Sequence, residues 1–247
     1  MMKKSGVVLL VILFLLTAVM PATIAHAYDL SVGGATWYSW WKLDNIKGGS
    51  DGDDSTLLYG PLFSFSFSDK WSVSGVFLYG HYELQLPHDS NEDVYRFDSD
   101  LVLNYRLASL VKVFAGAKIM GYKWKLSTLS ETDDGLSYNV GPAIGIGFTI
   151  PLTTNLYALT NISGLYARGK NTMNSDTGND KETLSSAYGG NGTLTLAWYI
   201  ASASTSINLG GRYQYFYLKH DNSESFEYEA HNHIYGVTLS AVYTFDL

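Results

Sequence analysis

The chain has 247 residues, no cysteine, and 16 basic against 23 acidic residues, a formal net charge of −7. This balance argues against nucleic acid as a partner, and the lack of cysteine excludes a lipid-attached N-terminus and a disulfide framework. Mean hydropathy is close to zero. That value suits a soluble protein, but a membrane barrel has it too, because half of each strand faces a polar lumen. The aromatic content of 15% fits the aromatic girdles of such barrels.

Residues 1–27 are predicted to be a cleaved export signal. Two lysines stand in the first four residues, an apolar run follows at 7–19, and Ala25-His26-Ala27 is a small-x-small cleavage site. The alternative is a retained inner-membrane helix, which needs a longer apolar run. The mature chain is then expected to be one domain over residues 28–247.

Ten segments alternate apolar and polar residues with a period of two, which is the pattern of strands with one greasy and one wet face. In the last segment Val237, Leu239 and Ala241 alternate with Thr238 and Ser240. The predicted strands are 30–42, 55–67, 71–84, 94–107, 110–126, 136–149, 155–168, 184–199, 204–218 and 231–246.

The joints between these strands alternate between tight turns and long polar segments. The predicted long joints are 43–54, 85–93, 127–135, 169–183 and 219–230. Outer-membrane barrels have an even strand number, short periplasmic turns and long external loops. The alternation therefore predicts that both ends of the mature chain lie in the periplasm.

Two strands allow their faces to be assigned residue by residue. In 136–149 the even positions are apolar, whereas the odd positions are small or polar. In 94–107 the charged residues all fall on one face, opposite Leu101 and Leu103. An ionised side chain near the bilayer midplane costs about 2–4 kcal/mol in a barrel, so the charged face is expected to line the lumen.

Pro61 and Pro142 fall inside predicted strands. Proline removes a ladder donor and is normally confined to an edge or a bulge, yet a closed barrel has no edge. We therefore expect a bulge or a locally unpaired carbonyl at both positions.

Lumen charges form the first candidate site. Cross-strand pairing of 94–107 with 110–126 would bring acidic and basic side chains within reach, and a confined interior needs its charges matched. A salt-bridged plug is the favoured interpretation, and a charged constriction that selects solutes is the alternative. The predicted set is Arg96, Asp98, Asp100, Arg106, Lys112, Lys118 and Arg212.

Histidines near the strand ends form a weaker candidate. His81 and Glu83 share one face of a strand, as do His231 and His233. Such pairs can bind a metal ion or supply a base, but no third ligand is fixed by spacing. We expect no metal site, no cofactor and no catalytic set.

The long joints are rich in acidic residues, for example Asp51, Asp53 and Asp54 and the segment 176–182. Their spacing lacks the terminal Glu of a calcium-binding loop. Such loops are usually solvated. If functional, they would attract divalent-bridged lipopolysaccharide or recognise an external ligand.

The export signal, the alternating strands and the aromatic-rich last strand resemble Gram-negative outer-membrane β-barrel proteins over the whole mature chain. The resemblance implies an all-β fold, a single closed antiparallel up-and-down transmembrane β-barrel of about ten strands. It also implies contact with outer-membrane lipids and lipopolysaccharide, and reading of the last strand by the barrel-assembly machinery. Leu247 stands where this family usually has a terminal aromatic residue.

The strand number is similar to that of omptin surface proteases and ten-stranded adhesins. The paired-aspartate and Asp-His sites of omptins have no residue-by-residue match in this sequence. The leading hypothesis is therefore a non-enzymatic outer-membrane barrel, acting as a narrow solute pore or a structural barrel. The alternatives are a surface adhesin or ligand-binding barrel using its outer loops, and a lipid A-modifying or peptide-hydrolysing membrane enzyme. A soluble exported barrel is the rival fold.

Overall fold

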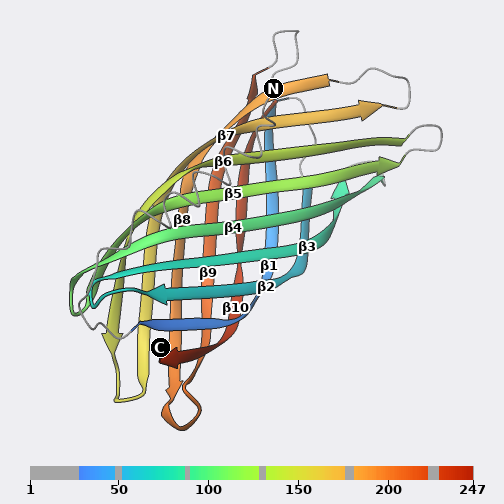
Figure 1. Ribbon diagram of the computed structural model, residues 1–247. Coiled ribbons are helices and arrows are strands. Elements are labelled where there is room, and N and C mark those ends of the chain that lie inside the picture. Colours follow the sequence, from blue (N-terminus) through green and yellow to red (C-terminus); the bar gives the residue numbers. More distant parts are fainter. Residues whose placement is uncertain are drawn as a thin grey trace, which may run out of the picture.

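The computed structural model describes residues 28–47, 52–86, 90–127, 132–175, 181–221 and 228–246. Ten antiparallel strands form one closed barrel, in which sequence neighbours pair and β1 pairs with β10 (Figure 1). The predicted all-β, up-and-down fold is confirmed. The predicted export signal and Leu247 lie outside the described residues. No described residue belongs to a helix long and apolar enough to cross a bilayer.

All ten predicted strands are present, and each is longer than predicted at the end away from the tight turns. The strands are β1 (Asp29–Lys47), β2 (Gly52–Ser66), β3 (Trp71–Leu86), β4 (Ser90–Ala108), β5 (Val111–Ser127), β6 (Thr132–Pro151), β7 (Leu156–Ser175), β8 (Lys181–Ile200), β9 (Thr205–Asp221) and β10 (Tyr228–Asp246). A short 3-10 helix, Ala201–Ala203, joins β8 to β9.

The long polar joints were predicted too long. Asp53 and Asp54 belong to β2, and Asp133 and Asp134 belong to β6. Beyond the apolar band both faces of a strand meet water, so the alternation of apolar and polar residues stops although the hydrogen-bond ladder continues. Asp51, Asp89, Glu131 and residues 176–180 lie outside the described part of the chain.

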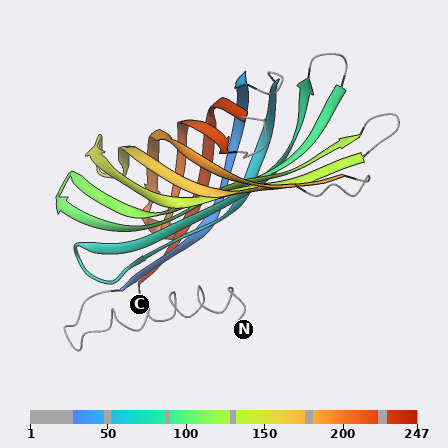
Figure 2. The same ribbon diagram turned by 90° about the horizontal axis from the view of Figure 1, so that it is seen from above.

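The barrel has two different ends. We call the end with the tight joints 67–70, 109–110, 152–155 and 201–204 the turn end, and the opposite end the loop end. The first residues of β1 pair with the last residues of β10, so both ends of the described chain lie at the turn end. Figure 2 shows β1 in blue alongside β10 in red.

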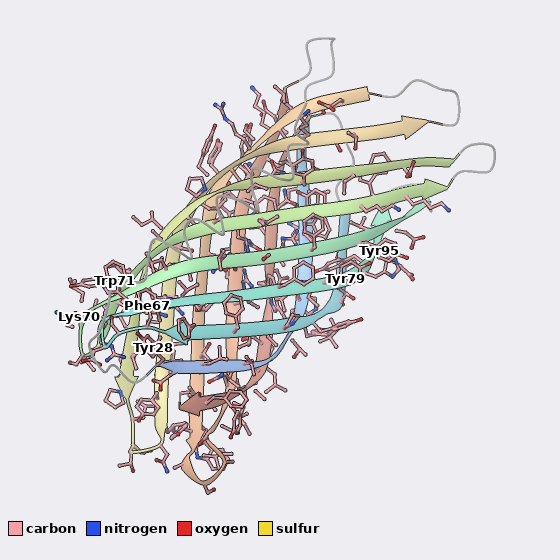
Figure 3. The ribbon with its side chains drawn as sticks, in the orientation of Figure 1. Tyr28, Phe67, Lys70, Trp71, Tyr79 and Tyr95 are labelled. Atoms are coloured by element: carbon pink, nitrogen blue, oxygen red, sulfur yellow. The ribbon has the colours of Figure 1, made fainter. Side chains whose placement is uncertain are left out.

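The outer surface carries an aliphatic band between two groups of aromatic side chains. Ten residues separate Tyr188 from Trp198 on β8. At a rise of about 3.3 Å per residue and a tilt of about 40°, that spacing spans roughly 25 Å along the barrel axis, the height of a barrel's apolar band. Figure 3 shows Tyr79 and Tyr95 at one end of β3 and β4, and Trp71 at the other.

The aromatic group nearer the loop end comprises Tyr38, Trp40, Tyr59, Tyr79, Tyr95, Tyr138, Tyr166, Tyr188, Tyr213 and Tyr235. The group nearer the turn end comprises Tyr28, Phe63, Trp71, Phe148, Trp198, Tyr243 and Phe245. All of these side chains are exposed on the outer surface of the barrel. The faces predicted for β4 and β6 agree with this arrangement, because Arg96, Asp98, Ser137 and Asn139 are buried inside the barrel.

Both internal prolines follow a glycine and interrupt one ladder without a bulge. The ladder of β2 with β3 is continuous from Leu62 to Ser66, whereas before Leu62 only Asp53 and Tyr59 are paired, so Gly60 and Pro61 are skipped without a change of register. The β6 ladder to β7 likewise skips Gly141 and Pro142. Of the two predicted outcomes, a bulge or a local loss of pairing, the structure shows the second, because the register does not shift at either proline. No extra residue is needed, because the ladder to the other neighbouring strand remains continuous.

Gly141 allows the close approach of β6 and β7. A Cβ atom there would lie 2.0 Å from the Tyr166 carbonyl oxygen, whereas nothing lies within 4 Å of a Cβ at Gly192. We expect Gly141→Ala to lower the free energy of unfolding by about 1–3 kcal/mol. The matched Gly192→Ala should raise it by about 0.5–1 kcal/mol, because alanine restricts the unfolded chain. Urea unfolding in detergent measures both, and equal effects would contradict the steric explanation.

Candidate functional site

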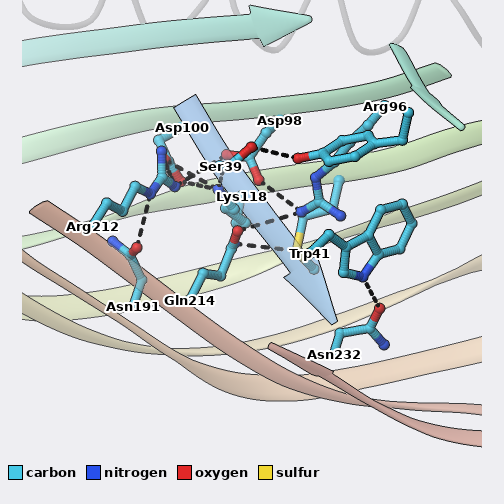
Figure 4. A network of polar contacts seen from close by, with 12 residues as sticks. Ser39, Trp41, Arg96, Asp98, Asp100, Lys118, Asn191, Arg212, Gln214 and Asn232 are labelled. Atoms are coloured by element: carbon cyan, nitrogen blue, oxygen red, sulfur yellow. Dashed lines mark hydrogen bonds and ion pairs between the residues drawn. The ribbon is translucent and has the colours of Figure 1, made fainter. Parts of the chain in front are cut away.

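Asp98 is the centre of a charge cluster inside the barrel (Figure 4). Its carboxylate is fully buried and forms ion pairs with three cations. Arg96 Nη2 lies 3.2 Å from one oxygen, Arg212 Nη2 lies 3.1 Å from the other, and Lys118 Nζ donates to that same oxygen. Burying an unpaired carboxylate costs several kcal/mol of free energy. Three positive charges around Asp98 compensate this desolvation cost.

The cluster crosses the whole lumen. Asp98 is on β4 and Arg212 is on β9, which lie five strands apart in either direction around the barrel. Arg96 on β4 also reaches across, donating to Gln214 Oε1 on β9 at 3.3 Å. Side chains from opposite walls of the barrel therefore contact each other inside the lumen.

Asp100 is the second anion of the cluster and faces its more open side. It accepts from Lys118 at 3.1 Å and from Arg212 at 3.3 Å, and it is about a quarter exposed. Asn191 Oδ1 accepts from Arg212 Nε at 2.9 Å. The cluster thus has three cations and two carboxylates, and one neutral amide accepts a hydrogen bond from each arginine.

Aromatic rings enclose the two arginines. The Arg96 guanidinium lies 5.3 to 5.8 Å from the ring centroids of Trp41, Tyr122 and Phe216. Arg212 lies 4.5 Å from the Trp37 ring centroid. Such cation–π contacts are strongest when water is excluded. The Nε and Nη1 atoms of Arg96 are buried without a hydrogen-bond acceptor, and the surrounding rings stabilise the charge of the guanidinium instead.

An apolar core fills the lumen on the loop side of the cluster. Its side chains come from most strands and are almost completely buried, which gives the interior the character of a folded protein core rather than a water-filled channel. The core comprises Trp41, Leu58, Leu78, Tyr82, Val94, Met120, Tyr122, Leu165, Ala167, Ala187, Phe216, Leu218 and Ile234, with Trp37 at the level of Arg212. We call the charge cluster and this core the plug.

A cavity occupies the lumen on the turn side of the plug. It has a volume of about 580 Å³ and reaches Asp100. Leu62, Val76, Val102 and Leu159 contribute apolar lining, and hydroxyl and amide side chains from β1, β8, β9 and β10 contribute polar lining. We call this cavity the vestibule.

Five of the seven predicted lumen charges meet in the cluster: Arg96, Asp98, Asp100, Lys118 and Arg212. Arg106 and Lys112 do not, because they lie several residues nearer the turn end of β4 and β5. The prediction did not single out Trp37, Trp41 and Gln214. An aromatic ring suits either face of a strand, so alternation alone does not decide which way Trp37 and Trp41 point, and both are buried inside the barrel.

His81 and Glu83 lie on the outer face of β3 and not in the lumen. His81 Nε2 is 2.9 Å from Asp93 Oδ1, and its ring stacks on Tyr95. The ligand atoms of His81, Glu83 and Asp93 lie within 4.8 Å of one another. This geometry suits a cation, but all three side chains are partly or largely exposed at the loop end, away from the lumen.

His231 and His233 also point outward, from β10. Their Nδ1 atoms lie 2.8 and 2.9 Å from the hydroxyls of Tyr215 and Tyr213. Since β1 and β2 separate β10 from β3, these histidines do not share a site with His81. The four residues proposed as a rim site therefore form two separate groups on the outer surface.

Solved structures with similar architecture are outer-membrane barrels. The outer membrane protease OmpT from Escherichia coli aligns with 92% of this chain and 99% of its own at a TM-score of 0.63 and 10% identity. This chain has the fold of an outer-membrane β-barrel. The translocator domain of NalP from Neisseria meningitidis (9% identity, 98% and 96% covered) and the toluene transporter TodX from Pseudomonas putida (10%, 91% and 91%) score only 0.45 and 0.35, too low to bear on the fold. No protein-family model and no curated protein matches the sequence.

Loss of the Asp98 charge should be strongly destabilising. Asp98→Asn leaves three buried cations facing Asp100 alone, so we expect the free energy of unfolding to fall by about 3–5 kcal/mol. Asp69→Asn, in an exposed turn, is the matched control and should change it by less than about 0.5 kcal/mol. Equilibrium unfolding in detergent micelles provides the measurement. Similar values for both variants would show that the cluster contributes little to stability.

Proposed function

We propose that this protein is an integral, non-enzymatic barrel of a Gram-negative outer membrane whose lumen is closed, so that it acts as a structural barrel and not as an open pore. The observation that carries the proposal is the contact between Asp98 and Arg212 across the full width of the lumen. The buried core beside it supports the same conclusion.

The outer surface supports the membrane location. Exposed aliphatic side chains lie between two aromatic groups at about the spacing of a bilayer's apolar core. This band would contact outer-membrane lipids, and lipopolysaccharide would lie nearer the loop end. Short turns of outer-membrane barrels face the periplasm, so the turn end and the described chain ends are assigned there.

The enzymatic alternative receives less support from the site. OmpT is a protease, but at 10% identity the likeness concerns the fold alone. Of the described residues, the histidines proposed for acid–base chemistry lie on the outer surface, and the carboxylates of the lumen are held in ion pairs. A hydrolase would need such groups at a position that substrate can reach.

Conductance in planar lipid bilayers tests the closed lumen. Purified wild-type protein should give no stable single-channel steps. The double variant Trp41→Ala with Phe216→Ala removes two large side chains of the plug and should introduce measurable steps, with retention of heat-resistant migration as the control for folding. Discrete steps from the wild-type protein would overturn the proposal.

Extraction behaviour tests the membrane assignment separately. Because the outer band is apolar, the protein should stay in the outer-membrane fraction after alkaline carbonate and high salt, and should need detergent for release. A soluble periplasmic protein under the same conditions is the control. Release without detergent would support the soluble exported barrel instead.

A further inference from the structure

Arg106 and Lys112 are the two lumen cations that the plug leaves out. They stand directly opposite each other on β4 and β5, and both line the lumen at the turn end. Among the described residues neither has a carboxylate within ion-pair distance. Like charges directly opposite on paired strands repel each other. The barrel therefore keeps an uncompensated pair of positive charges at its turn end.

A small cavity lies at this pair. Its volume is about 140 Å³, and its charged lining consists of Lys70, Arg106 and Lys112 against Asp69, an excess of two positive charges. The cavity is also lined by residues with hydrogen-bonding side chains: Ser66, Ser68, Ser72, Asn104, Ser109 and Thr149. A water molecule occupies about 30 Å³ of liquid, so the cavity has room for a tetrahedral oxyanion.

Gly147 provides the space in which the Lys112 side chain lies. A Cβ atom at Gly147 would be 2.7 Å from Lys112 Cε and 2.4 Å from Asn161 Oδ1. The Lys112 ammonium is 5.9 Å from the Phe114 ring centroid. Lys112 therefore packs its stem beside Gly147 and lines the small cavity.

We propose that the Lys70, Arg106 and Lys112 group binds a phosphate-type oxyanion at the turn end of the barrel. Arginine matches a phosphate with two parallel hydrogen bonds, and lysine adds a point charge. A phosphomonoester carries a charge of about −1.5 to −2 at neutral pH, which matches the excess of two positive charges. Bound between Arg106 and Lys112, it would also relieve their repulsion.

The vestibule extends this site for a phosphate that carries an apolar group. Thr149 lines both cavities, and the vestibule beyond it presents Leu62, Val76, Val102 and Leu159. Free phosphate and the headgroup of a phospholipid share the oxyanion, but only the lipid would also place acyl carbons against these side chains. The proposed oxyanion site is independent of the proposed function, because it would remain whether or not the lumen conducts ions.

The test is unfolding of the full mature barrel in a nonionic detergent, titrated with inorganic phosphate or with dihexanoyl phosphatidic acid. Wild-type protein should show a saturable rise in its unfolding midpoint, with chloride at matched ionic strength giving none. Arg106→Gln with Lys112→Gln should weaken phosphate binding at least about ten-fold, as loss of charge-assisted hydrogen bonds does. Lys123→Gln, an exposed lysine on the outer face of β5, is the matched control and should bind like wild type.

A second readout guards against a folding defect. Since neutralisation removes the repulsion, the double variant should unfold at a higher midpoint than wild type in phosphate-free buffer. Tighter binding of dihexanoyl phosphatidic acid than of phosphate assigns the site to a lipid, and equal binding assigns it to a free anion. No phosphate-dependent shift in wild type, an equal shift with chloride, or an equal loss in Lys123→Gln would overturn the proposal, whatever the conductance result.

Discussion

The ion pairs of Asp98 are the constraint on which the interior depends. A carboxylate with no exposed surface is stable only because Arg96, Lys118 and Arg212 approach it from two opposite walls of the barrel. Opposite walls can meet only if long side chains reach inward at the same height, and the aromatic rings beside the arginines then exclude water. The proposed closure of the lumen rests on this contact, which also divides the interior into a packed half and an open half.

The two halves of the lumen therefore have different physical character. Toward the loop end, side chains fill the interior as in a soluble protein core. Toward the turn end, the vestibule remains open and ends on Asp100, which is consequently the most exposed member of the cluster. Arg106 and Lys112 belong to this open half, where solvent or a bound anion can compensate charges that the packed half could not hold unpaired.

Much of the fold could be predicted because period-two alternation assigns each residue to one face of its strand. It placed Asp98 and Lys118 inside, and the tight turn between β4 and β5 made them neighbours. It failed where both faces of a strand meet water, as at Asp53 and Asp134, because the contrast between faces disappears there while pairing continues. Alternation also did not assign Trp37 and Trp41 to the inner or the outer face, since an aromatic ring suits either one.

By itself, the sequence determined the strands, their order, the outward face and the charged inward face of β4, since these depend on local alternation and short connections. Only the tertiary structure decided that β9 lies opposite β4, that Arg212 reaches Asp98, and that Arg106 and Lys112 lie outside the charge cluster. Contacts across a lumen depend on how a sheet closes, which is set by strand number and stagger together. Neither strand number nor stagger can be read from a single segment of the chain, so the charge cluster around Asp98 forms only when the barrel closes.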